Sequence, residues 1–377
     1  MSGAAAGDDG VLDRAERLAE DLRGRQLDAL LVASPVDLRY LTGFTGSHGL
    51  ALLAADPGGS SKPAEHRFFT DFRYATQAVA EVPEEFGREI VAGDLFDAAA
   101  AALAGADGRL GFDEGTLTVD RHGRLLELLG ATWELIPCAE AIRRLRAVKD
   151  AGEIARIAAA AELADAALDG VLQDGLAGRT ERDVAIDLEL RMRRLGAEAP
   201  SFPSIVAAGA HGALPHAAPR DHEIPRNVLV TIDWGALHEG YCSDCTRTYA
   251  TGEGITAEAR EIYGLVLAAQ QEGLAALRPG RSGREVDAEA RAVIERAGHG
   301  EHFGHGLGHG VGLEIHEGPR LSRTAGEEPL RAGSVVTVEP GVYLPGVLGV
   351  RIEDLVVVLE DGREVLSALP KELTVVS

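Results

Sequence analysis

From Asp150 onward the chain passes twice through the same expected order of elements, two helices followed by a group of strands. Four capping residues carry signals that begin helices, and three of them are followed three positions later by an acidic residue. They are Asp150, Thr180, Thr256 and Ser282. Strand-like sequence follows each helix pair, at residues 228–250 and 335–359. This order predicts an internally duplicated α+β unit, although no residue-level repeat is visible.

The sequence before residue 148 has a different pattern and predicts a smaller α/β domain. Residues 27–33 and 50–54 are short apolar runs typical of buried strands. The segment between them contains Pro35 and several glycines, so we expect a loop there. A chain of 377 residues is long enough for two domains. We expect a disordered tail over residues 1–9, an N-terminal domain over 10–147 and a C-terminal domain over 148–377.

Charge and hydropathy argue against nucleic-acid and membrane partners, and cysteine content indicates the compartment. The chain has 37 basic and 60 acidic residues, a net charge of −23, and such a surface repels nucleic acid and anionic membranes. No apolar run has the length of a membrane helix, and the first residues lack the basic-then-apolar order of a signal peptide. Three cysteines suit a reducing compartment. We therefore expect a cytoplasmic protein without nucleic-acid or membrane partners.

Two aspartates in the first strand region are spaced to share one face of a hairpin. Asp233 and Asp244 are eleven residues apart, so direct pairing would leave a two-residue turn at His238 and Glu239, followed by Gly240. Carboxylates side by side repel each other, and the arrangement needs a cation or a proton to offset the repulsion.

Two glutamates repeat this arrangement in the second strand region. Glu339 and Glu353 are fourteen residues apart, which allows direct pairing across an odd loop centred on Gly346. Glu339 stands inside the apolar run SVVTVEP, where an unpaired charge would be strongly destabilising. A solvated Glu353 and a capping role for Glu339 are the alternatives. We predict a metal-binding or catalytic role for all four carboxylates.

The glycine-rich stretch FGHGLGHGVGLEIHE, residues 303–317, supplies histidines. His305 and His309 are four apart, but the alternating glycines are poor helix formers and no Glu follows His305, so a helical zinc motif is excluded. The glycines instead allow the backbone to approach a ligand closely. One histidine with four carboxylates is an oxygen-rich set that suits Mn²⁺, Co²⁺ or Fe²⁺ as well as Zn²⁺. Two such ions would share one activated water.

The C-x-x-C of Cys242 and Cys245 invites a zinc or redox interpretation. In a strand the two side chains point to opposite faces, so they cannot easily bind one ion. A structural zinc site would also need a second ligand pair. We predict that both are packing residues.

These stretches resemble the pita-bread metallopeptidases, specifically the Xaa-Pro aminopeptidase and Xaa-Pro dipeptidase (prolidase) branch. The matching segments are SFPSIVAAGAHGALPHAAP, TIDWGALHEGYCSDCTRTY, FGHGLGHGVGLEIHEGP and VVTVEPGVYLPGVLGVRIEDLVVV. RYLTGF and FFTDFRYATQA are similar to the creatinase-like N-terminal domain. The resemblance implies an α+β pita-bread catalytic domain preceded by a smaller α/β domain.

The resemblance also implies a set of metal ligands. Two divalent ions are expected, with Mn²⁺ or Co²⁺ preferred over Zn²⁺ or Fe²⁺. Their ligands would be Asp233, Asp244, His309, Glu339 and Glu353. Asp244 and Glu353 would contact both ions, Asp233 would complete one site, and His309 with Glu339 would complete the other. Glu339 would in addition transfer a proton.

Residues around these ligands are implied by the same resemblance. His216, His305 and His316 would hold the substrate carbonyl and stabilise charge in the transition state. Tyr343 and Arg351 would support the ligands, Arg351 by orienting a carboxylate. A further residue, Arg320, is a candidate cation for a proline carboxylate, with an ordinary surface arginine as the alternative.

The implied activity is hydrolysis of the bond before proline in short peptides with proline at the second position, by a homodimer. We favour an Xaa-Pro aminopeptidase, with an Xaa-Pro dipeptidase as the alternative and a non-catalytic pita-bread binding protein as a remoter one. Creatinase works without these metals, and the full ligand set argues against it. Methionine aminopeptidase usually lacks an N-terminal domain of this kind.

Overall fold

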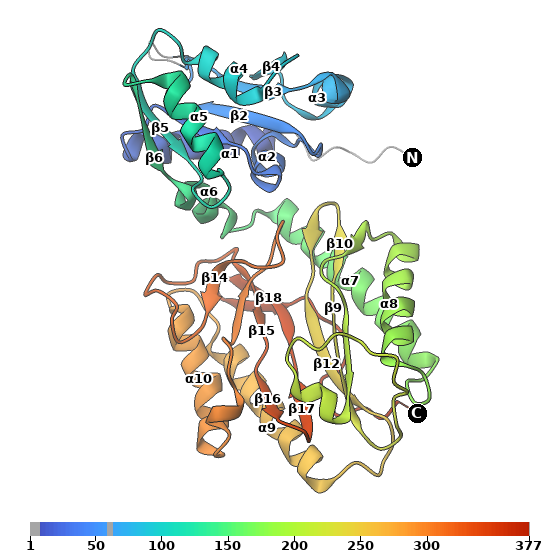
Figure 1. Ribbon diagram of the computed structural model, residues 1–377. Helices are drawn as coiled ribbons and strands as arrows, with labels where there is room; N and C mark the ends of the chain where they lie inside the picture. The colour runs from blue at the N-terminus through green and yellow to red at the C-terminus, as the bar shows by residue number, and fades with distance from the viewer. Residues whose placement is uncertain (1–7, 59–62, 377) are drawn as a thin grey trace. The chain divides into compact units, whose positions relative to one another are not determined.

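The computed structural model describes residues 8–58 and 63–376, and the chain forms two compact units, residues 1–146 and 147–377 (Figure 1). The tail expected over residues 1–9 lies almost entirely outside the described residues, and helix α1 begins at Asp8. Each unit has its own sheets and helices and is described separately.

The first unit is a six-stranded mixed sheet with helices packed against it (Figure 1). The strands are β1 (Ala29–Val32), β2 (Gly49–Ala54), β3 (His66–Thr70), β4 (Phe86–Ile90), β5 (Gly108–Phe112) and β6 (Trp133–Pro137). Their order is β4-β3-β2-β1-β5-β6, and β2 runs antiparallel to β1 and β3. The helices are α1 (Asp8–Gly24), α2 (Pro35–Thr42), α3 (Ala75–Glu81), α4 (Leu95–Ala102), α5 (Val119–Leu129) and α6 (Ala139–Arg146).

Helix α2 occupies the segment where the sequence predicted only a loop, and that prediction was wrong. The Ser34 side chain caps the helix by accepting a hydrogen bond from the Asp37 amide. Pro35 stands at the first helical turn, where its fixed φ favours the helix and its missing N–H removes no hydrogen bond. Gly43 ends the helix at φ 75°, a conformation that glycine adopts without strain. Proline and glycine therefore mark the two ends of a helix here.

The second unit contains the two predicted helix pairs, which are confirmed. They are α7 (Ala151–Gln173), α8 (Glu181–Leu195), α9 (Ala257–Ala276) and α10 (Gly283–Arg296). Asp150 and Ser282 each form a full capping box with the glutamate three residues on. Thr180 and Thr256 cap the other two helices through their hydroxyl groups.

Each helix pair is followed by antiparallel strands, as the duplicated order predicted. The first half contains β7 (Ala199–Pro200), β8 (Ile205–Ala208), β9 (Leu229–Trp234), β10 (Ala236–His238), β11 (Tyr241–Cys242) and β12 (Cys245–Ala250). The second half contains β13 (Gly308–Gly310), β14 (Glu317–Leu321), β15 (Val335–Val338), β16 (Gly341–Leu344), β17 (Leu348–Arg351), β18 (Asp354–Leu359) and β19 (Gly362–Val365). Helices α7 and α8 lie beside the first group of strands, and α9 and α10 lie beside the second (Figure 1).

The core of the second unit fixes these helices against their strands. Trp234, at the end of β9, is fully buried and its indole N–H donates to the carbonyl of Ala164 in α7, at 2.9 Å. Val266 and Ala269 of α9 are fully buried in the same apolar cluster as Val336 and Val356 of the second sheet. Both hairpins that carry the predicted acidic residues therefore stand on a packed helix layer.

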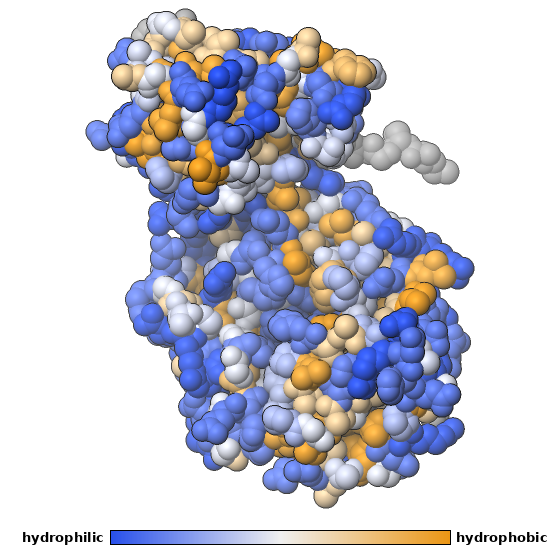
Figure 2. All heavy atoms as spheres, viewed as in Figure 1, coloured by the Kyte–Doolittle hydropathy of each residue, from blue (hydrophilic) through white to orange (hydrophobic). Residues whose placement is uncertain are grey.

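The face of each unit that Figure 2 shows is mainly polar. Hydrophilic residues predominate on the visible face of each unit, and hydrophobic residues occur there in small groups (Figure 2). None of the helices that the structure describes combines the length and apolar character needed to cross a bilayer.

Candidate metal centre

The hairpin that carries Asp233 has a register different from the predicted one. Asp233 in β9 pairs with Thr246 in β12, and not with Asp244. The two-residue turn is formed by Glu239 and Gly240, both with positive φ, and not by His238 and Glu239. A tight hairpin turn needs positive φ at its central residues, and glycine at the second of them satisfies this at low cost. The turn therefore moves one residue along the chain, and Asp244 becomes a diagonal neighbour of Asp233.

The predicted register of the second hairpin is confirmed. Val338 pairs with Asp354 on one side of the two glutamates, and Gly341 pairs with Arg351 on the other. Glu339 and Glu353 thus occupy opposed positions between the two paired segments. Gly346 lies at the centre of the connecting turn with φ 75°.

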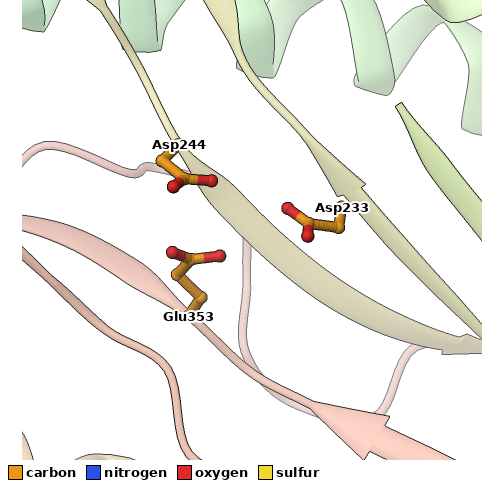
Figure 3. Close-up of side chains that lie close together, drawn as sticks. All are labelled: Asp233, Asp244 and Glu353. Atoms are coloured by element: carbon orange, nitrogen blue, oxygen red, sulfur yellow. The ribbon is translucent and has the colours of Figure 1, made fainter. Parts of the chain in front are cut away.

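Three carboxylates from the two halves converge on one point (Figure 3). One oxygen from each of Asp233, Asp244 and Glu353 lies within 4.8 Å of the others. Asp244 and Glu353 are almost fully buried, at 6% and 1% exposure. Asp233 Oδ1 and Glu353 Oε1 are buried and accept no hydrogen bond from any residue that the structure describes. Two buried carboxylate oxygens of this group are therefore left without a hydrogen-bond donor among the described residues.

Burial and mutual repulsion make this cluster unstable as a set of free anions. Burial raises the pKa of Asp244 well above its ordinary value, and the charges of Glu353, Asp233 and Glu339 raise it further. Burial likewise raises the pKa of Glu353, with Glu339 and Asp233 as further causes. A cation relieves both effects at once, because it replaces lost hydration and screens the repulsion. The oxygen donors and the two unpaired oxygens fit a divalent cation.

His309 and Glu339 adjoin this group and extend it. His309 Nε2 lies 3.5 Å from Asp244 Oδ2 and 3.4 Å from Glu339 Oε1. The other ring nitrogen, Nδ1, lies 3.1 Å from the carbonyl of Gly310, so it carries the proton and donates it there. This hydrogen bond leaves the Nε2 lone pair directed at the acids, which is the tautomer a metal ligand requires. Burial lowers the pKa of His309 to about 4, which favours this neutral ring.

Two threonines hold the acidic side chains in place, and the sequence reasoning missed both. Thr246 Oγ1 donates to Glu353 Oε2 at 2.7 Å. Thr337 Oγ1 donates to Glu339 Oε1 at 3.2 Å and accepts from the amide of His309 at 3.1 Å. In a strand residues two apart share a face, so the positions of Thr246 and Thr337, two residues from a predicted ligand, could have indicated them.

Arg351 links the centre to the neighbouring side chains. Its guanidinium donates to Asp233 Oδ2 at 2.6 Å and to the hydroxyl of Tyr343 at 2.9 Å. That hydroxyl also lies 2.9 Å from His305 Nε2. His305 Nδ1 donates to the carbonyl of Gly306, so Tyr343 donates to Nε2. Burial lowers the pKa of His305 to about 4, and the ring is neutral.

Most of the site residues predicted from the sequence line one cavity of 510 Å³. It contains ten of the eleven residues that the sequence singled out, all but Arg320: Asp233, Asp244, His309, Glu339, Glu353, His216, His305, His316, Tyr343 and Arg351. Phe202, Pro203 and Ile315 add an apolar wall that the sequence reasoning did not identify. The cavity therefore combines the acidic group with histidines and an apolar surface.

Arg320 lies outside the cavity lining but close to its histidines. It is exposed in β14, and its guanidinium forms no hydrogen bond or ion pair with the residues that the structure describes. Partial burial lowers the pKa of His316, and the charges of His216 and Arg320 lower it further. Arg320 also lowers the pKa of His309, so it is a cation near His309 and His316 without an acidic partner among the described residues.

The cysteines are buried packing residues, as predicted. Cys242 and Cys245 are free thiols that lie in strands of two different sheets and belong to two different apolar clusters. Burial raises the pKa of Cys242 to about 12, which keeps its thiol protonated.

Comparison with known proteins identifies this arrangement. The family model of metallopeptidase family M24 matches residues 155–360, which contain every residue of the centre. The chain belongs to metallopeptidase family M24. A second family model, the creatinase/prolidase N-terminal domain, matches residues 14–148. This M24 peptidase is a metallo-exopeptidase with the pita-bread fold, and the family uses divalent metal ions.

Three similar proteins cover almost the whole chain. An Xaa-Pro dipeptidase of Pyrococcus furiosus is 36% identical over 366 residues, covering 96% of this chain and 99% of its own. The structure of an Xaa-Pro dipeptidase from Bacillus anthracis aligns with a TM-score of 0.90 and 38% identity, covering 97% and 99%. That of an X-Pro aminopeptidase from Thermotoga maritima aligns with a TM-score of 0.85 and 36% identity, covering 95% and 99%.

Proposed function

We propose that this M24 peptidase is an Xaa-Pro dipeptidase that depends on two divalent ions. One observation carries the proposal: three carboxylates converge in the cavity with two buried oxygens that no described residue satisfies. Similarity to the two dipeptidases, at 36% and 38% identity, supports dipeptide substrates and favours the dipeptidase over the aminopeptidase that the sequence reasoning preferred.

The ions would be held by the five residues named from the sequence, Asp233, Asp244, His309, Glu339 and Glu353. When bound, such ions activate water and polarise the scissile carbonyl. The donor set, one imidazole and four carboxylates, is rich in oxygen and suits Mn²⁺ or Co²⁺, with Zn²⁺ or Fe²⁺ as alternatives.

The chain's own side chains supply the proton transfer and the substrate contacts. Glu339 would take a proton from the attacking water and pass it to the proline nitrogen, which must leave as an amine. His216, His305 and His316 line the same cavity and would contact the substrate carbonyl, where negative charge develops. The bond before proline is a tertiary amide without an N–H, so recognition cannot rely on that donor.

Arg320 supplies the feature that separates a dipeptidase from an aminopeptidase. A dipeptide ends in a carboxylate next to its proline ring, and this charge needs a cation beyond the metal centre. An arginine binds a carboxylate with two parallel hydrogen bonds, and Arg320 has no competing acidic partner among the described residues. We assign Arg320 this role.

Substrate length tests the assignment. The protein is freed of metal with a chelator, reloaded with Mn²⁺, Co²⁺ or Zn²⁺, and assayed with Ala-Pro and Ala-Pro-Ala. We expect hydrolysis of the dipeptide and little of the tripeptide. Arg320→Ala should lose Ala-Pro activity selectively, while Arg323→Ala, an exposed neighbour that pairs with Glu295, should not. Exclusive cleavage of the tripeptide would instead make the protein an aminopeptidase.

A further inference from the structure

One cavity wall is a loop whose two ends meet at a single buried carboxylate. The loop, residues 209–219, carries His216 and is called the His216 loop. Pro215, Ala217 and Pro219 of this loop also line the cavity. It leaves strand β8 at Ala208, which ends that strand, and the chain returns beside the start of helix α8. The carboxylate belongs to Glu181, the first residue of α8.

Glu181 accepts hydrogen bonds from both ends of the His216 loop. At the first end, the amide of Ala208 donates to Oε1 at 2.9 Å. At the far end, the amide of Arg220 donates to Oε2 at 3.0 Å, and its guanidinium donates to both oxygens at 3.1 Å. His211, inside the loop, places Nδ1 2.9 Å from Oε2 and 3.0 Å from Oε1. A carboxylate only accepts, so this nitrogen carries a proton.

This carboxylate is buried and remains charged. The Glu181 side chain is 1% exposed, and that of His211 is 7% exposed. Burial opposes ionisation, but hydrogen bonds from Arg220, Ala208 and His211 outweigh it and lower the pKa of Glu181 below its ordinary value. A buried anion with all its acceptor positions used is a rigid attachment point.

The middle of the loop is fixed against the metal centre. A Cβ at Gly349 in β17 would lie 1.8 Å from the carbonyl oxygen of Gly212, so the two backbones touch there. Arg351 Nη1 donates to the carbonyl of Pro215 at 3.2 Å. His216 follows Pro215 directly, so it lies between the attachment to Arg351 and the attachment of Arg220 to Glu181.

We propose that Glu181 is a positioning residue that sets the His216 loop, and with it one wall of the substrate cavity. Glu181 touches none of the residues that converge at the metal centre, so its effect passes through the loop. The consequence for catalysis rests on the proposed peptidase function, whereas the consequence for loop order does not.

Two variants test this role. Glu181→Gln keeps the size and one oxygen, but its amide N–H groups would face the donors of Arg220 or His211. Arg220→Lys removes only the two parallel guanidinium hydrogen bonds to Glu181. Because the Arg220 side chain is half-exposed, we expect this variant to fold even if the Glu181 variant does not. Asp187→Asn is the control, because Asp187 lies on the same helix and pairs with Arg179 and Arg191, away from the loop.

Three measurements are made on the full-length protein. We expect the KM for Ala-Pro to rise roughly ten- to hundredfold in Glu181→Gln, with a smaller change in kcat, because displaced binding groups cost this much. Metal content should stay at the wild-type value. Trypsin should cut after residue 220 faster in both variants, as mass spectrometry of the fragments would show, and not in Asp187→Asn.

Wild-type KM and wild-type trypsin cleavage in both variants would overturn the proposal. A loss of bound metal would also overturn it, since it would place Glu181 in support of the metal centre. If the wild-type protein hydrolyses no Xaa-Pro peptide, the proposed function fails, and the cleavage rate after residue 220 alone decides whether Glu181 holds the loop.

Discussion

Removal of one buried hydroxyl should weaken metal binding without removing a ligand. Thr246 is fully buried, donates to Glu353 Oε2 at 2.7 Å and accepts from Arg351 Nε at 3.0 Å. Thr246→Val preserves shape and removes both hydrogen bonds. Glu353 Oε1 already accepts no hydrogen bond from a described residue. With valine at position 246, neither oxygen of the Glu353 carboxylate would accept one. Its orientation would then depend on packing alone.

The expected loss of Mn²⁺ affinity follows from the charge of Glu353, which accepts the hydrogen bond from Thr246. A hydrogen bond to a charged group contributes about 1.5–3 kcal/mol, and each factor of ten in affinity corresponds to about 1.4 kcal/mol. Loss of the bond to Glu353 should therefore weaken Mn²⁺ binding by roughly ten- to hundredfold, the range found when partners of metal ligands are removed. At subsaturating Mn²⁺, kcat/KM should fall by a similar factor and recover when more metal is added.

Competition with a chromogenic chelator measures the affinity, and peptide hydrolysis across a Mn²⁺ series measures the recovery. Thr231→Val is the control, because Thr231 is buried in the same sheet and, among the described residues, its hydroxyl bonds only to Thr248 and the Gly349 carbonyl. An affinity within twofold of wild type in Thr246→Val, or an equal loss in Thr231→Val, would refute the argument that the hydroxyl orients the carboxylate.

Three further predictions concern the same domain. Asp244→Asn should lose bound metal and lower kcat/KM by more than about a hundredfold, by metal analysis and peptide assay, because a ligand should matter more than its hydrogen-bond partners. Burial raises the pKa of Glu339 from 4.5 to about 8, so between these two pH values the folded metal-free protein holds a proton that the unfolded chain has lost. Urea unfolding should therefore show the free energy of unfolding falling as the pH rises from about 4.5 to about 8. Bound Mn²⁺ should abolish this fall. Gly349→Ala should lower the free energy of unfolding by about 1–3 kcal/mol or more in the same assay, because the added methyl group would collide with the carbonyl of Gly212. Gly264→Ala on α9 should not destabilise the fold, because a methyl group there meets open space.

The sequence predicted the structure best where a chemical rule allows only one local conformation of the backbone. Asp150 and Ser282 begin helices because each can form a reciprocal cap with a glutamate, and both do. Glu339 and Glu353 are opposed because the turn is centred on Gly346, where glycine accepts positive φ. In such cases a local requirement of the backbone determines the register, and the longer-range arrangement follows from it.

The sequence was less informative where two solutions have similar energies. The turns at His238-Glu239 and at Glu239-Gly240 differ by one residue, and only the preference for glycine at the second turn position separates them. Pro35 is compatible with a loop and with a first helical turn. The attachment of the His216 loop to Glu181 joins residues 27 and 39 positions apart, and no spacing rule predicts such contacts.

Anomalous diffraction from crystals of the Mn²⁺-loaded protein tests the central claim most directly. We predict two manganese peaks, with oxygens of Asp233, Asp244, Glu339 and Glu353 and the Nε2 of His309 as ligands. A centre without manganese at saturating concentration, or manganese bound only at other residues, would contradict it.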